Sequence, residues 1–215
     1  MCAVVDESTG KSLEFRHLIK MDKYRNVWMH SFANKLGRLA QGIRYIKGAY
    51  TIEFIPLSSV PKEETVTYSR IVCMFRPQKD EEHRTRLTAG RNLIVCMYDV
   101  STPTASLIAN KLLFNSVIST PGAKFHGMDI ILLYLNKNLS KPRYMRIKLD
   151  IVPKEIVDRY NLLTIARNEH VYIKIKGGMY GLPKAGIMAN ELLKTCLAAK
   201  GYHKAQLTPG LYRHV

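Results

Sequence analysis

The sequence predicts an α+β fold in which antiparallel strands are backed by helices. Segments with apolar residues at helical spacing alternate with segments rich in β-branched and aromatic residues, which is typical of that class. The chain has 215 residues, of which 47% are hydrophobic, so it can bury a sizeable core in one or two compact units. Neither an internal repeat nor a low-complexity segment interrupts it.

The first half of the chain predicts one helix followed by three strands. Residues 27–41 carry apolar side chains at helical spacing, and Gly42 follows as a stop signal. Segments 50–55 and 65–75 are rich in β-branched and aromatic residues and flank a polar connection, so we expect an antiparallel hairpin. A third strand is expected at 84–95. The apolar positions of the helix are Trp28, Phe32, Leu36 and Leu39.

Beyond residue 100 the pattern becomes helical again. We expect a helix over 102–120, with Pro103 in its first turn and Gly122 ending it. Residues 130–135 form a continuous apolar run directly after Asp129, as expected of a central strand that is buried on both faces. The apolar face of the helix is formed by Leu107, Ile108, Leu112, Leu113 and Val117.

The last part of the chain predicts a connecting region, a short strand and a helix. The connecting region contains Pro142 and Pro153, and the strand is expected at 171–175. A turn at 177–178 then leads into a helix over 185–199. Antiparallel strands and helices therefore alternate through the chain.

The charge of the chain points to a polyanionic partner. Lys and Arg total 33 against 17 Asp and Glu, which gives a formal net charge of +16. The basic residues are spread along the whole length, which favours nucleic acid over a membrane surface. A basic surface without a ligand is the alternative that charge alone leaves open.

Cysteines, histidines and hydropathy indicate neither a metal site nor a membrane segment. The cysteines have no metal-ligand spacing, and the histidines show no paired spacing. The N-terminus lacks an apolar signal core, and the longest apolar run, 130–135, is too short to span a bilayer. We therefore expect an intracellular protein, in a cytoplasmic particle or the nucleus. The cysteines are Cys2, Cys73, Cys96 and Cys196.

Two segments carry a resemblance to a known family. Residues 176–189 read KGGMYGLPKAGIMA and resemble the palm motif of copia-type retrotransposon reverse transcriptases, a basic approach followed by Y-G-L-x-Q-A. Residues 128–136 read MDIILLYLN and resemble the first catalytic motif of that family. In that motif an Asp is followed five residues later by an aromatic residue and then by Leu-Asn. Asp129 and Tyr134 stand at the first two of these positions.

Two upstream segments extend the resemblance. RTRL at 84–87 resembles the fingers strand that usually reads Lys-Ala-Arg-Leu, and DVSTPTASLIANKLL at 99–113 resembles the segment and helix that follow. The motifs keep the order and spacing of the family from about Trp28 to Val215. The resemblance implies reverse-transcriptase fingers and a partial palm. The expected regions are an N-terminal extension (1–26), a fingers-like region (27–100) and a partial palm (101–215).

The sequence also departs from the family pattern. Lys184 stands where the palm motif has Gln, and Ile131 stands where a polar or basic residue is usual. The second catalytic motif, an aromatic residue followed by a paired Asp-Asp, has no counterpart in the sequence. We therefore expect a polymerase fragment that is inactive alone, cut off before that hairpin. A non-enzymatic, basic nucleic-acid-binding remnant of the polymerase scaffold is the alternative.

The resemblance implies a role for each candidate residue. Asp129 would be catalytic and would hold Mg²⁺ in a two-metal mechanism, while Tyr134 would exclude ribonucleotides by clashing with a 2′-hydroxyl. By spacing alone, Tyr134 would instead fill the core. Arg84 and Arg86 alternate on one strand and so share a face, either solvated or binding the triphosphate of a dNTP. Lys184 would either contact phosphate or template in place of the Gln, or be the result of sequence decay in an element that is no longer under selection. The residues expected to line the pocket for the RNA or DNA primer-template are Tyr180, Gly181, Leu182 and Gly186.

Overall fold

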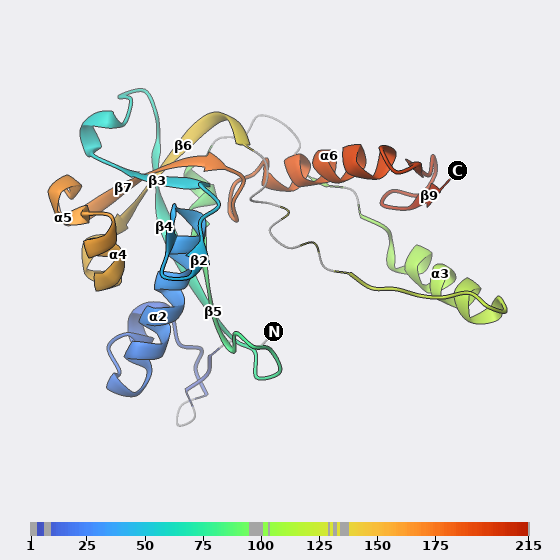
Figure 1. The fold of residues 1–215 in the computed structure, drawn as a ribbon, viewed down its shortest axis with the longest axis horizontal. Coiled ribbons are helices and arrows are strands. Elements are labelled where there is room, and N and C mark those ends of the chain that lie inside the picture. Colours follow the sequence, from blue (N-terminus) through green and yellow to red (C-terminus); the bar gives the residue numbers. More distant parts are fainter. Residues whose placement is uncertain are drawn as a thin grey trace.

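The computed structural model describes residues 4–6, 10–94, 101–102, 104–128, 130, 133 and 138–214. It combines a five-stranded mixed sheet with helices, which confirms the predicted α+β class. Figure 1 shows the sheet and the N-terminal helices together in one body, from which the helix α6 (Ala185–Ala198) leads away. The helix α3 (Leu107–Ser119) lies apart from the sheet, on the side toward which α6 extends. None of the helices in the described ranges is both long and apolar enough to cross a membrane.

The central sheet has the strand order β3-β7-β6-β4-β5. Each neighbouring pair is antiparallel except β4 and β6, which run parallel over a short stretch. The sheet draws strands from both sides of the boundary expected at residue 100. Its strands are β3 (Ile52–Ile55), β4 (Val66–Phe75), β5 (His83–Ala89), β6 (Asn138–Lys148) and β7 (His170–Gly177).

The hairpin predicted from 50–55 and 65–75 is wrong, although both segments contain strands. β3 pairs with β7, placing Ile55 opposite Tyr172, while β4 pairs with β5. The connection from β3 to β4 includes the 3-10 turn η1 (Leu57–Ser59). That connection is longer than the roughly two to five residues of a hairpin loop, so it does not hold the two strands in register.

Strand β6 occupies the region that the sequence predicts to be a connection. Pro142 lies inside it, at a place where the pairing with β7 shifts register between Asn138 and Arg143. A proline cannot donate to a strand ladder, and it is tolerated at such an irregularity because the ladder is already interrupted there. The proline therefore marks a bulge in a strand rather than a loop.

The helix α2 (Asp22–Leu39) confirms the predicted helix and begins before residue 27. It is fastened to β5 by Ser31 and Thr85: the Thr85 amide donates to the Ser31 hydroxyl at 3.0 Å, and the Thr85 hydroxyl donates to the Ser31 carbonyl at 3.0 Å. Both side chains are buried. Thr85 therefore points toward α2, and its two neighbours on β5 point away from that face.

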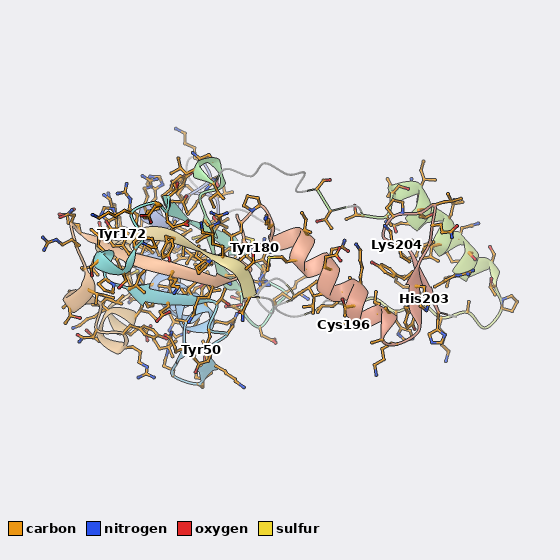
Figure 2. The ribbon with its side chains drawn as sticks, turned by 90° about the horizontal axis from the view of Figure 1, so that it is seen from above. Tyr50, Tyr172, Tyr180, Cys196, His203 and Lys204 are labelled. Carbon is orange, nitrogen blue, oxygen red and sulfur yellow. The ribbon has the colours of Figure 1, made fainter. Side chains whose placement is uncertain are left out.

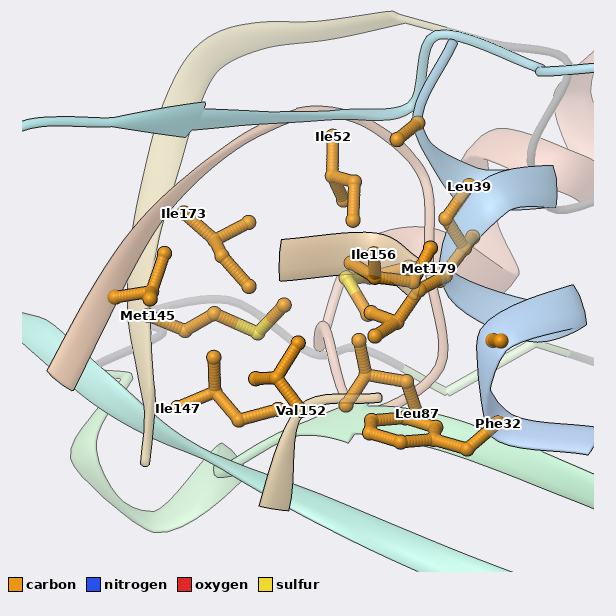
Figure 3. Close-up of a cluster of buried hydrophobic side chains, with 14 of the residues drawn as sticks. Phe32, Leu39, Ile52, Leu87, Met145, Ile147, Val152, Ile156, Ile173 and Met179 are labelled. Carbon is orange, nitrogen blue, oxygen red and sulfur yellow. The ribbon is translucent and has the colours of Figure 1, made fainter. Parts of the chain in front are cut away.

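The core lies between one face of the sheet and the helices that cover it. Figure 3 shows Leu87, Met145 and Ile173 from three strands packed with Phe32 of α2 and Ile156 of α4 (Lys154–Arg159). Each of these five side chains is fully buried. Burying a side chain of this size contributes about 1.5–3 kcal/mol, so the packing of α2 and α4 against the sheet stabilises the fold substantially.

Several short elements complete the body around α2 and the sheet. The chain reverses after α2 through a two-stranded hairpin, and the final part of β6 leads through a 3-10 turn into two short helices. These elements are α1 (Phe15–Leu18), β1 (Gly42–Ile43), β2 (Ile46–Lys47), η2 (Arg91–Leu93), η4 (Leu149–Ile151), α4 (Lys154–Arg159) and α5 (Leu162–Ile165).

The remaining helices and strands lie mostly away from the core, which the start of α6 reaches through Ala185. α3 (Leu107–Ser119) starts later than the predicted 102–120, because the Ser106 hydroxyl caps it by accepting from the Ala109 amide at 3.1 Å. Pro103 is outside the described residues. α6 (Ala185–Ala198) confirms the predicted last helix and is followed by a hairpin of β8 (Tyr202–Lys204) and β9 (Tyr212–His214).

Two apolar segments that were predicted to be buried differ from expectation where the structure describes them. Four of the five side chains on the predicted packing face of α3 are exposed, with Leu112 at 65% and Ile108 at 71%, and Val117 is half-buried. In the run 130–135 only Ile130 and Leu133 are described, and neither is in a strand. Ile130 is 44% exposed. Local apolarity thus predicted a degree of burial that most of these described residues do not have.

Candidate anion-binding site

The candidate site begins with two arginines on β5. Arg84 and Arg86 lie on one face of this strand, opposite Met74 and Val72 of β4, while Thr85 and Leu87 face the core. This confirms that the two arginines share a face. Both are partly buried, so their guanidinium groups are less well hydrated than those of fully exposed arginines.

The segment that follows β7 packs against the end of β5. The Ala89 amide donates to the Tyr180 carbonyl at 3.0 Å. The guanidinium carbon of Arg86 lies 5.0 Å from the centroid of the Tyr180 ring, which is cation–π distance. Figure 2 shows Tyr180 where the chain passes from the sheet to α6. The tertiary structure therefore joins the RTRL segment to the Y-G-L segment.

Gly181 makes this close approach possible. Its φ is +89°, and a Cβ added there would lie 2.1 Å from the Ala89 carbonyl oxygen. Any other residue would have to move the backbone and adopt an unfavourable conformation. Leu182 is buried beside it and anchors the start of α6 in the core.

A third cation belongs to this site and was missed by the sequence reasoning. Lys35 of α2 is only 8% exposed, and its Nζ lies 5.9 Å from the centroid of the Tyr180 ring. The sequence does single out Lys35 by its spacing. It falls three residues after Phe32 and four before Leu39, which places it on the apolar face of the helix. A lysine at such a position is unusual unless it has a function or a partner.

Lys35 is a buried cation whose pKa is affected by burial and by three neighbouring arginines. Burial is the largest cause that lowers the pKa of Lys35 from 10.5 to about 8. Glu81 raises this pKa and so opposes the shift. The neighbouring charges that lower it are those of Arg38, Arg84 and Arg86. The local excess of positive charge is therefore only partly compensated.

The cations around the site are not fully paired with acceptors in the described part of the chain. Among the described residues, the buried Nε of Arg86 has no hydrogen-bond partner. Glu81 is shared, since it lies 3.4 Å from Arg76 and 4.0 Å from Arg38. An anion with several oxygens would supply acceptors for the guanidinium groups and offset their repulsion with Lys35.

Two other predicted site residues lie at the start of α6. Lys184 is exposed at the N-cap position of α6, and Gly186 follows in its first turn, where an added Cβ would meet the Thr102 hydroxyl at 3.0 Å. Asp129 and Tyr134 lie outside the described residues, so their predicted roles stay predictions. Within the described part, no group of three or more His, Cys, Asp or Glu residues is placed to hold a metal ion.

Comparison with known proteins does not assign the chain to a family. No protein-family model, curated protein or solved structure matches it. The features that bear on function are therefore its own: the contact of Arg86 with Tyr180, the buried Lys35 beside them, and the net charge of +16.

Proposed function

We propose that this chain is the fingers and part of the palm of an RNA-directed DNA polymerase of the copia-type reverse transcriptases. The contact between Arg86 and Tyr180 carries the proposal. It brings together two segments, far apart in the sequence, that separately resemble the fingers strand and the palm motif of that family. Segments that form one nucleotide pocket are expected to meet in this way.

In this proposal the cluster around Arg86 binds the triphosphate of an incoming nucleotide. Arg84 and Arg86 supply guanidinium groups that hydrogen-bond phosphate oxygens in pairs, and Lys35 adds a point charge. Because the site is partly buried, each of these interactions is stronger than it would be in water. Tyr180 holds Arg86 in place through its ring.

This sequence contains only part of the set of carboxylate ligands that a polymerase needs to hold its Mg²⁺ ions. A two-metal mechanism needs several convergent carboxylates. The resemblance places only Asp129 at a ligand position, and the paired Asp-Asp has no counterpart. One carboxylate does not fit a two-Mg²⁺ site, so we expect nucleotide binding by this chain without phosphodiester formation.

Nucleotide binding tests the proposal directly. The chain would be titrated with a fluorescent dNTP, and then with a primer-template duplex. Replacing Arg84 and Arg86 together by Ala should weaken dNTP binding at least about tenfold, as expected for two lost charge-assisted contacts, while duplex affinity changes little. The matched control is Arg159→Ala with Arg167→Ala, two exposed arginines on the α4 side of the body. Equal dNTP affinity of the two double variants would show that the site is misassigned.

A second candidate function is a non-enzymatic protein that binds nucleic acid on the same scaffold. The observation that favours it is the charge of +16, which exceeds what one triphosphate site uses. This function predicts nucleic-acid binding that falls steeply with salt and no measurable dNTP binding. The same titrations therefore separate the two candidates.

A further inference from the structure

A groove opens where strand β4 parts from strand β6. The two strands pair in parallel only from Val66 to Tyr68, opposite Tyr144 to Arg146. From Ser69 onward β4 pairs with β5 instead. Beyond this stretch the two strands no longer pair, and residues of β4, β6 and α1 line the groove there. The groove has a volume of about 750 Å³.

The walls of this β4–β6 groove are strongly basic. They come from elements far apart in the sequence: α1 and the turn after it, α2, β6 and the start of β7. The single carboxylate in the lining is that of Asp150. Among the described residues only one of the lining cations has an ion-pair partner, Arg16, which lies 3.2 Å from Glu14. The basic lining side chains are Arg16, Lys20, Arg25, Arg146, Lys148 and His170.

An aromatic ring stands in the groove in a fixed orientation. Tyr68 is 44% exposed although it lies in the sheet. Its hydroxyl donates to the Asn92 side chain at 2.7 Å. One side of the ring lies over Gly90, where an added Cβ would be 2.6 Å from a ring carbon. The ring is therefore held in place before any ligand binds.

We propose that the β4–β6 groove binds single-stranded nucleic acid, with its basic side chains on the phosphates and Tyr68 stacking on a base. A positively charged groove that contains an ordered aromatic ring is how proteins hold single strands without reading their sequence. A membrane surface fits less well, because the charges line a recess rather than a protruding face. The groove shares no lining residue with the cluster of Arg84, Arg86 and Lys35, so it stands apart from the proposed nucleotide site.

The test of the charge contribution uses a fluorescent 20-nucleotide oligo(dT) and anisotropy at several salt concentrations. Arg146→Gln with Lys148→Gln should bind at least about tenfold more weakly than the unchanged chain. The log–log salt slope should fall by about 1.4, since each phosphate contact to a single strand contributes about 0.7. The matched control is Lys47→Gln with Lys62→Gln, which removes the same charge from exposed positions outside the groove. Equal affinity of the two variants would overturn the proposal.

The test of the aromatic contribution uses Tyr68→Leu and Tyr68→Phe. Leu should weaken oligo(dT) binding at least about fivefold with an unchanged salt slope, because stacking releases no counterions. Phe keeps the ring and should keep the affinity, which distinguishes stacking from a general loss of structure. Full oligo(dT) affinity in the Leu variant, or tighter binding to a duplex of the same length than to oligo(dT), would contradict the single-strand assignment.

Two further measurements distinguish nucleic acid in the groove from a lipid surface and from binding at the proposed nucleotide site. Vesicles of phosphatidylserine should bind less tightly than oligo(dT) at equal phosphate concentration. If Arg146→Gln with Lys148→Gln abolished vesicle binding but left oligo(dT) binding intact, the groove would be a lipid site instead. Arg84→Ala with Arg86→Ala should leave oligo(dT) binding nearly unchanged, so a failure of the proposed nucleotide site would not be mistaken for a failure of the groove.

Discussion

The guanidinium carbon of Arg86 lies 5.0 Å from the centroid of the Tyr180 ring, and this contact ties an edge strand of the sheet to the segment that leads into α6. The hydrogen bond from Ala89 to Tyr180 runs beside it at 3.0 Å. Side chain and backbone thus hold the same two segments together. This junction and the buried Leu182 together hold the start of α6 against the sheet.

The coupling between Arg86 and Tyr180 can be measured with a double-mutant cycle. We expect Arg86→Ala and Tyr180→Leu to show a coupling of about 0.5–2 kcal/mol in the free energy of unfolding, because a partly buried guanidinium over a ring is worth about that much. Urea denaturation of the four proteins gives the value. Tyr180→Phe keeps the ring and should retain the coupling, and strictly additive effects of the Ala and Leu changes would contradict a direct interaction.

Lys35 makes the stability of the protein depend on pH above neutrality. Its pKa is 10.5 when unfolded and about 8 when folded, so below pH 8 both states are protonated and the full cost of the buried charge is present. Between pH 8 and 10.5 the folded state releases the proton first, and the cost disappears as pH rises. Lys35→Met should therefore be more stable than the unchanged chain by about 3 kcal/mol at pH 7, and that difference should shrink toward pH 10. Urea denaturation from pH 7 to 10 measures it, and a constant difference would contradict the lowered pKa.

The same lysine should make nucleotide binding pH-dependent if the proposed site is correct. Above pH 8 Lys35 is mostly neutral in the free protein and has to be protonated when a triphosphate binds. The affinity for the nucleotide should therefore fall by up to about tenfold per pH unit. Lys35→Arg keeps the charge at all these pH values and should remove the dependence. Titration with a fluorescent dNTP at pH 7, 8 and 9 tests this. Parallel pH profiles for the two proteins would exclude Lys35 from the site.

Gly181 is predicted to be irreplaceable at the junction. Gly181→Ala combines a positive φ with a Cβ that would lie 2.1 Å from the Ala89 carbonyl oxygen, so it should destabilise the protein by more than about 2 kcal/mol. Gly122→Ala is the matched control, since Gly122 also has a positive φ but no neighbour within 4 Å of an added Cβ. That change should cost only about 1 kcal/mol. Equal losses in thermal denaturation would show that the close approach to β5 is not what requires glycine.

The apolar side chains of α3 should contribute little to stability. Leu112 and Ile118 are 65% and 84% exposed, so replacing each by Ser should change the free energy of unfolding by no more than about 0.5 kcal/mol. Leu87→Ala in the core should cost about 2–5 kcal/mol by comparison. Urea denaturation provides both values. A large loss from the α3 changes would mean that these side chains are covered in solution.

Local pattern was a good guide to elements whose packing follows from their own residues. The apolar stripe of α2 predicted its helix and its buried face, and the alternation on β5 predicted the shared face of Arg84 and Arg86. Strand partners were harder, because an edge strand such as β3 carries no local signal for pairing with β7 rather than β4. Pro142 predicts a loop from its sequence context, because the bulge that accommodates it is a property of the pairing between β6 and β7.

The sequence by itself determined the α+β class, the positions of α2 and α6, the excess of positive charge and the motifs that resemble a polymerase, since each depends on residue types and their spacing along the chain. Only the tertiary structure decided that Arg86 meets Tyr180, that Lys35 is buried beside them, and that β4 parts from β6 to leave a basic groove. These features join residues from distant parts of the chain. They depend on which strands pair and on how α2 packs against the sheet. Alternative pairings would keep the same local sequence pattern and differ only in contacts between distant residues, so local periodicity does not predict them.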